Sequence, residues 1–253
     1  VSIAKGVQVK GTIAAVSYDS NATALRVGSG ASAGTIEVGG SVAASGSTKD
    51  GTVARGLVID SGATVGSIVV SGSVAAAAGS TEKGSAIAIL DSSGSVSSLS
   101  NTGKISATGG KSGSNVAIDL SANSSGVTLT QAAASATATT MPSIVGDIRL
   151  GSGNDVLTVS AGAIAGNLSL GAGNDSIVLS GASSLTGNIA FGTGTNSLSL
   201  TGTSKVAGNV DFGGGAGTLT LGGTSSLTGA ISNSGNVAVA LNGGTLTASN
   251  TGS

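Results

Sequence analysis

Two copies of a short glycine-rich turn contain the residues best suited to chemistry. Gly151-Ser-Gly-Asn154-Asp155 precedes one strand-like segment, and Gly171-Ala-Gly-Asn174-Asp175 precedes the next. Carboxylate and amide oxygens are the ligands that calcium prefers. The candidate calcium ligands are therefore Asp155, Asp175, Asn154 and Asn174. The alternative is a plain turn, in which glycine takes a positive φ and the Asn and Asp side chains hydrogen-bond to the backbone.

The spacing of the two acids favours an ion more than either acid alone would. If the segments stack as successive turns of one coil, Asp155 and Asp175 lie one turn apart. Two stacked carboxylates repel each other unless a cation bridges them or one of them is protonated. This pair is therefore the place where a calcium ion should be sought. We expect no other cofactor.

Most catalytic chemistry is excluded by composition. The chain has no His and no Cys, which rules out Ser-His-Asp and Cys-His catalysis and the usual zinc sites. Glycan cleavage needs several acids or bases on one face, but Asp147 and Arg149 are followed one repeat later by Asn167 and Ser169. Sugar-binding sites also usually contain aromatic side chains, and Tyr18 is the one aromatic residue outside the apolar repeats. We predict that the chain is not an enzyme.

Composition also restricts the partners. Lys and Arg number 10 against 11 Asp and Glu, for a net charge of −1, so no basic patch is available for nucleic acid. No apolar run is long enough for a transmembrane helix. With 45 glycines, 39% hydrophobic residues and a mean hydropathy of +0.41, the chain must bury small aliphatic side chains in a thin core. A solenoid has such a core.

The C-terminal half repeats every 20 or 21 residues. The repeats start at Gly146, Gly166, Gly187, Gly208 and Gly229. Each repeat has three short segments that alternate apolar and polar residues, which is the pattern of strands with one buried face. The first segments should form an internal ladder of Ile148, Leu168, Ile189, Val210 and Ile231.

The N-terminal half has longer repeats. Segments beginning at Gly34, Gly66 and Ser97 are 32 and 31 residues apart, and each is followed by a polar loop. The predicted loops, which contain much of the charge and could bind a partner or merely solubilise the surface, are Ser45–Arg55, Gly79–Gly84 and Gly109–Asn115.

The repeats predict one all-β, right-handed parallel β-helix with three short strands per rung and about ten rungs. Residues 1–130 should form loop-bearing rungs of about 31 residues, 131–142 an irregular insertion, and 143–253 regular rungs of about 21 residues.

Two resemblances extend this interpretation. Gly146 to Thr247, with turns such as GNLSLGAGNDSIVLSG, and the upstream SNTGKISATGG resemble passenger domains of classical bacterial autotransporters. The Gly-Asn-Asp turns partly resemble the calcium-binding repeats of RTX toxins, which recur every nine residues. The autotransporter resemblance implies a right-handed β-helix exported across the outer membrane. Strands with the aromatic girdles of an outer-membrane barrel are lacking, so we expect an isolated passenger segment or a cleaved product.

The sequence thus favours an extracellular structural or adhesive rod of a Gram-negative bacterium. We expect it to self-associate end to end into surface or matrix fibres, because open β-helix ends expose unpaired strand edges. Other cell-surface or matrix components are further partners, whereas nucleic acid and a direct membrane span are not expected. The alternatives are a calcium-dependent surface-layer protein and a glycan-active β-helix enzyme.

Overall fold

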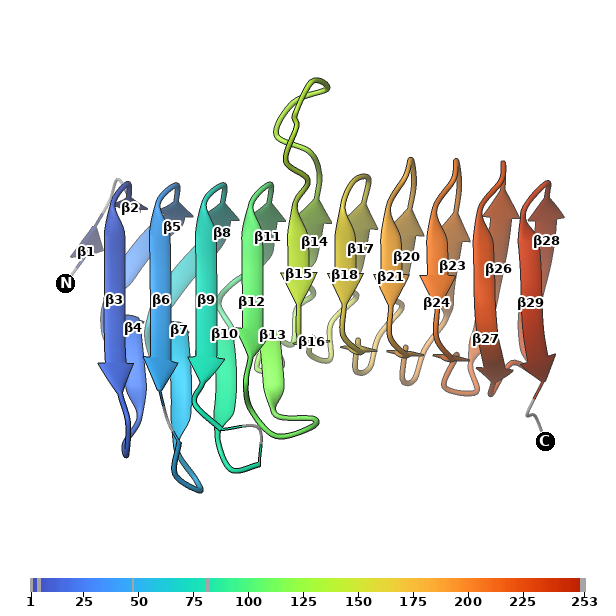
Figure 1. The fold of residues 1–253 in the computed structure, drawn as a ribbon. Helices are drawn as coiled ribbons and strands as arrows, with labels where there is room; N and C mark the ends of the chain where they lie inside the picture. Colours follow the sequence, from blue (N-terminus) through green and yellow to red (C-terminus); the bar gives the residue numbers. More distant parts are fainter. Residues whose placement is uncertain (1, 4–5, 47, 81, 251–253) are drawn as a thin grey trace.

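The protein is an all-β rod, as predicted. The structure is a computed structural model that describes residues 2–3, 6–46, 48–80 and 82–250. In this part of the chain every regular element is a strand, and no helix is long and apolar enough to cross a membrane. The strands stack along one axis, with the chain termini at opposite ends of the rod (Figure 1).

The strands form three stacked faces. The first face consists of β1 (Ser2–Ile3), β2 (Val7–Val9), β5 (Ser32–Val38), β8 (Thr64–Val70), β11 (Ser98–Asn101), β14 (Thr128–Gln131), β17 (Val156–Val159), β20 (Ser176–Leu179), β23 (Asn196–Leu200), β26 (Ala216–Gly222) and β28 (Asn236–Asn242).

The second face consists of β3 (Thr12–Ser17), β6 (Ser41–Gly46), β9 (Ser73–Ala78), β12 (Lys104–Thr108), β15 (Ser143–Val145), β18 (Ala163–Ala165), β21 (Ser184–Thr186), β24 (Lys205–Ala207), β27 (Ser226–Ser232) and β29 (Thr245–Asn250). The third face consists of β4 (Ala22–Val27), β7 (Val53–Ile59), β10 (Ser85–Asp91), β13 (Asn115–Asp119), β16 (Asp147–Arg149), β19 (Leu168–Ser169), β22 (Ile189–Ala190), β25 (Val210–Asp211) and the end of β27.

The coil is a right-handed parallel β-helix. Strands of each face pair in parallel with the strands one rung before and after. In Figure 1 the second face runs downwards in front and the chain returns upwards behind while it advances from the N-terminal end. This is the handedness that parallel crossover connections almost always have.

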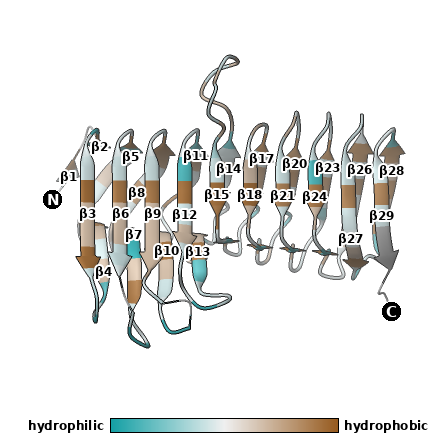
Figure 2. Cartoon of the chain, in the orientation of Figure 1, coloured by the Kyte–Doolittle hydropathy of each residue, from teal (hydrophilic) through white to brown (hydrophobic). Residues whose placement is uncertain are grey.

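The core consists of the predicted ladders. Ile148, Leu168, Ile189, Val210 and Ile231 pair in register from rung to rung. Figure 2 shows the hydrophobic bands at matching heights on successive strands. Burial of each such side chain contributes roughly 1.5–3 kcal/mol, so the regular repeat is itself the source of stability. Phe191 and Phe212 extend the core one rung apart, with ring centroids 5.2 Å apart.

Rung length differs between the two halves as expected. Thr35 hydrogen-bonds to Ser67, 32 residues later in the chain, whereas Asn188 donates to Asn167, 21 residues earlier. The extra residues of the N-terminal rungs lie between the second and third faces, at 47–52, 79–84 and 109–114. Positions 47 and 81 of the predicted loops lie outside the described residues. Arg55, which the sequence placed in the first loop, lies within β7 instead.

The irregular insertion begins one residue later than expected. Gln131 is the last residue of β14 and is fully buried, so the segment that protrudes from the rod between β14 and β15 is 132–142 (Figure 1). Gln131 pairs in register with Asn101 on one side and Val159 on the other. Its Oε1 accepts a 2.9 Å hydrogen bond from Nδ2 of Asn101. Two polar side chains thus occupy core positions that are aliphatic in the neighbouring rungs.

A column of glycines lets the rungs approach each other closely where the second face turns into the third. Gly187 has a φ of +146°, and a Cβ atom there would lie 2.1 Å from the carbonyl oxygen of Gly166. Only glycine avoids this clash, since any side chain would force the two rungs apart. The column therefore explains why glycine recurs at this position in each regular rung.

Candidate functional site

The two candidate carboxylates are stacked inside the rod. Asp155 and Asp175 immediately precede β17 and β20, and Val156 pairs in register with Ser176. The side chains of Asp155 and Asp175 are 0% and 1% exposed. The sequence correctly placed the two acids one rung apart, but they lie within the wall of the coil and not on its surface. We call them the buried carboxylate pair.

Each carboxylate of the pair binds a backbone amide of the preceding rung. The N–H of Val127 donates to Oδ1 of Asp155 over 2.6 Å, and the N–H of Asp155 donates to Oδ1 of Asp175 over 2.9 Å. The same interaction continues from the N–H of Asp175 to Oδ1 of Asn196, also 2.9 Å long. The buried side chains therefore tie four consecutive rungs together.

The second oxygen of each carboxylate has no such partner. Oδ2 of Asp155 and Oδ2 of Asp175 are buried without a hydrogen-bond partner in the described structure. Burial raises the pKa of Asp155 from its usual 3.8 to about 6; the N–H of Val127 opposes this rise, and the negative charge of Asp175 adds to it. Burial also raises the pKa of Asp175, against the effect of the Asp155 N–H. Each carboxyl of the pair thus holds a proton more tightly than an exposed carboxyl does, because burial disfavours the charged form more than the single N–H donor favours it.

Asn154 and Asn174 face the other way. Both side chains are exposed, and consecutive residues of an extended chain point to opposite sides. Oδ1 of Asn154 accepts the N–H of Asn174 over 2.7 Å, and Oδ1 of Asn174 accepts the N–H of Thr195 over 2.8 Å. Both amide oxygens are therefore already used in joining one rung to the next.

The four predicted ligands do not fit one shared calcium ion. Calcium takes six to eight oxygen ligands around a single point. Here the carboxylates point inwards, the amides point outwards, and the amide oxygens accept backbone hydrogen bonds. Among the described residues, no group of three or more Asp or Glu side chains could hold a metal ion. The arrangement instead matches the turn interpretation, extended by a buried pair of acids.

Sequence reasoning missed a second ladder of asparagines on the outside of the rod. In the regular rungs each Gly-Asn turn places an Asn Oδ1 so that it accepts the backbone N–H one rung later. The ladder consists of Asp147, Asn167, Asn188, Asn209 and the N–H of Ala230. The signal was present in the repeated Gly-Asn dipeptide, but only stacking shows which amide each side chain reaches.

Asp147 and Arg149, the pair considered for glycan cleavage, also form hydrogen bonds within the rod. Asp147, which the sequence paired with Arg149, accepts from the N–H and Nδ2 of Asn167 through Oδ1. Nη2 of Arg149 donates to the carbonyl oxygen of Gly113 over 3.4 Å. The two side chains thus join neighbouring rungs on the third face through hydrogen bonds.

Comparison with known proteins adds no family to this description. No protein-family model matches the chain, and neither a curated protein nor a solved structure shows significant similarity to it.

Proposed function

We propose that this chain is an extracellular structural and adhesive rod of a Gram-negative bacterium, of the kind displayed as an autotransporter passenger, and that copies associate end to end into fibres. The proposal is supported by the regular solenoid, by hydrogen-bonded ladders that use most turn side chains for stacking, and by the resemblance of the Gly-Asn repeats to passenger domains. Export across the outer membrane and display on the cell surface are parts of the same proposal.

The observation that carries self-association is the exposure of apolar side chains on the last described rung. Val239 and Leu241 of β28 are 51% and 54% exposed, whereas their register partners Leu219 and Leu221 are fully buried. Among the described residues, β28 pairs only with β26, and β29 pairs only with β27. A parallel edge with uncovered aliphatic side chains can pair with a further rung. The first rung of a second copy, which also has strands on three faces, can supply this rung.

The geometry of this contact is head to tail. The C-terminal end of one copy meets the N-terminal end of the next, so the two contacting surfaces differ. Heterologous contacts of this kind produce open filaments when they do not close into rings. Each copy should add about 45–50 Å of length at about 4.8 Å per rung.

Electron microscopy and sedimentation velocity of the purified chain test this proposal. We expect filaments whose length grows with protein concentration. The variant Val239→Lys/Leu241→Lys should remain monomeric, because charges on an edge strand prevent pairing. The matched control Val145→Lys/Val156→Lys alters two valines on the sides of the rod that are each 37% exposed, and it should still assemble.

Monomers at every concentration, or equal assembly by both double variants, would overturn the end-to-end model. Calcium chelation distinguishes this model from the calcium-dependent surface-layer alternative. Assembly that is unchanged in a chelator supports a fibre held by strand pairing. Dispersal by the chelator would instead favour the surface-layer alternative.

A further inference from the structure

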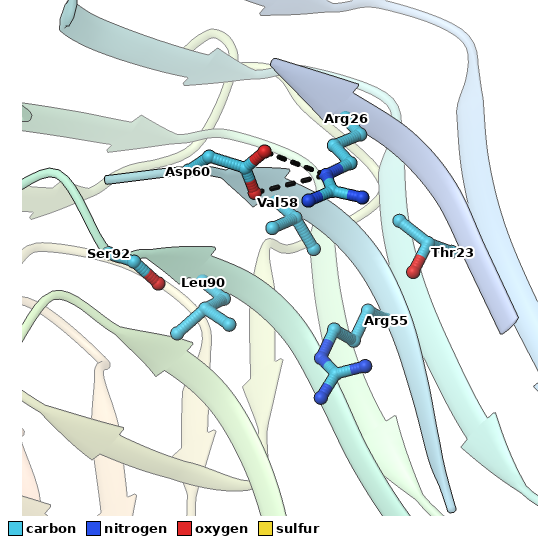
Figure 3. Close-up of a pocket in the computed structure, with 7 residues that line it drawn as sticks. All are labelled: Thr23, Arg26, Arg55, Val58, Asp60, Leu90 and Ser92. Carbon is cyan, nitrogen blue, oxygen red and sulfur yellow. Dashed lines mark hydrogen bonds and ion pairs between the residues drawn. The ribbon is translucent and has the colours of Figure 1, made fainter. Parts of the chain in front are cut away.

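A small pocket lies on the outer surface of the third face, where β4, β7 and β10 are adjacent (Figure 3). Its volume is about 250 Å³. Arg26 of β4 is in register with Val58 of β7, and Val58 is in register with Leu90 of β10. These three side chains lie in one row across the rungs, so the two apolar residues form a floor beside the arginine.

Two guanidinium groups line this pocket. Arg55 lies in register beside Thr23, and Figure 3 shows Arg26 at the end of the row of Val58 and Leu90, with Arg55 beside that row. Nε of Arg26 donates to Oδ1 and Oδ2 of Asp60 over 3.0 and 2.8 Å. This ion pair uses only Nε, so both Nη groups of Arg26 lack a protein acceptor among the described residues.

Arg55 has no anionic partner in the described part of the chain. It is half-buried in β7, and its pKa is lowered, first by burial and then by the charge of Arg26. Two arginines against one carboxylate leave a net positive charge in the pocket. A planar guanidinium with unused donors is suited to bidentate binding of a carboxylate. An anion placed between Arg26 and Arg55 would relieve their mutual repulsion.

The other side chains narrow the class of anion. Thr23 and Ser92 supply hydroxyl groups at the pocket, and Asp60 supplies carboxylate oxygens that can accept further hydrogen bonds. Val58 and Leu90 offer an apolar surface. A sugar acid has one carboxylate, several hydroxyl groups and an apolar face of C–H groups, which together match this lining.

We propose that the Arg26–Arg55 pocket binds the carboxylate of a sugar acid, with Arg55 as the principal donor. The acidic sugar would be one unit of an acidic polysaccharide, held on the side of the rod. Although β4 belongs to the first rung, which the end-to-end contact would use, the pocket opens on the outer side of the third face. Sugar binding and filament formation are therefore separate properties, each with its own test. A monomeric chain can bind the sugar, and a filament can form without it.

The test is a titration of the full chain with glucuronate, followed by NMR and calorimetry. We expect glucuronate to bind and to shift the amide signals of Thr23, Arg55 and Ser92, with weaker binding at higher salt. Neutral glucose should not bind, and N-acetylaspartate amide should bind at least about tenfold more weakly than glucuronate, because it lacks the hydroxyl groups.

Variants assign the binding to this pocket. Arg55→Gln and Arg26→Gln should each weaken glucuronate binding at least about tenfold, since each removes a charge-assisted hydrogen bond. Arg149→Gln is the matched control, because Arg149 also projects from the third face but lies outside the pocket. It should bind like the unaltered chain.

Three results would overturn the inference. They are no glucuronate binding by the unaltered chain, an equal loss of binding in Arg149→Gln, and equal affinity for N-acetylaspartate amide, which would indicate an acidic peptide instead. If an arginine variant fails to fold, the amide shifts of the unaltered chain still decide the location. Shifts confined to another face would reject the pocket.

Discussion

Replacing Asp155 by asparagine changes one atom of the buried carboxylate pair and should remove its dependence on protonation. The folded-state pKa of Asp155, about 6, lies above the ordinary value of 3.8. The folded state therefore binds this proton more tightly than the unfolded chain does. Stability should be greatest at low pH, fall as pH rises between about 4 and 6, and stay at the lower level above that range.

Asp155→Asn should consequently be more stable than the unaltered chain at neutral pH, by about 1–3 kcal/mol, and its stability should vary less with pH. Asparagine already occupies the equivalent position two rungs later, where Nδ2 of Asn196 reaches the carbonyl oxygens of Gly192 and Phe212. Urea unfolding at a series of pH values measures the effect. Asp50→Asn, in an exposed loop, is the control. A destabilised Asp155→Asn at neutral pH would contradict this account of the pair.

At the scale of strands, the polar pair of β11 and β14 should act as a unit. Asn101 and Gln131 replace aliphatic positions of the first-face ladder, between Val70 and Val159. Gln131→Leu alone removes the acceptor of Asn101 Nδ2, and Asn101→Val alone removes the donor to Gln131 Oε1. Each single change should cost about 1–3 kcal/mol because a buried polar group loses its partner.

The double variant Asn101→Val/Gln131→Leu should lose less stability than the sum of the two single losses, since neither polar side chain is then left without the other. It should not fully regain the stability of the unaltered chain, because Asn101 also bonds to Gly103 and Ser143, and Gln131 also bonds to Ala161 and Ala163. Urea unfolding of all four proteins gives the coupling free energy as a double-mutant cycle. Additive losses would show that the two side chains do not depend on each other, contrary to the 2.9 Å hydrogen bond.

On the scale of the whole rod, stability should vary along the axis. Each rung contacts only its neighbours, so local opening should begin where a rung has one neighbour instead of two. In the described part of the chain β28 pairs with β26 alone, so its amides should exchange with solvent faster than those of β17 and β20 in the middle. Hydrogen exchange followed by mass spectrometry measures this gradient in the monomeric Val239→Lys/Leu241→Lys variant. Uniform protection along the rod would mean that it unfolds as one unit.

The sequence was sufficient for the fold because the period of the apolar residues defines the stacking. The aliphatic ladder from Ile148 to Ile231 was predictable from spacing alone. The direction of polar side chains was not, because a glycine-rich turn does not reveal which of two adjacent residues faces the core. Asn154 and Asp155 are neighbours in sequence but lie on opposite sides of the wall.

Other features depended on contacts between rungs that no local pattern reveals. Gln131 interrupted the apolar pattern and was interpreted as the start of an insertion, although Asn101 satisfies it within the core. The predicted polar loop ends at Arg55, but this residue lies in β7. Its proximity to Arg26 arises from pairing between rungs and was therefore invisible in the linear sequence.

The glycine column and the outer asparagine ladder together imply that the length of the rod is quantised. Each Asn Oδ1 of the ladder accepts a hydrogen bond from the backbone N–H one rung later, as Asn188 does from Asn209. Tandem duplication of the segment 187–207 in the gene would preserve every such contact and lengthen the rod by one step of about 4.8 Å. A duplication that does not contain whole rungs would misalign all rungs beyond it. Gene duplication can therefore change the length of the rod only in steps of one whole rung.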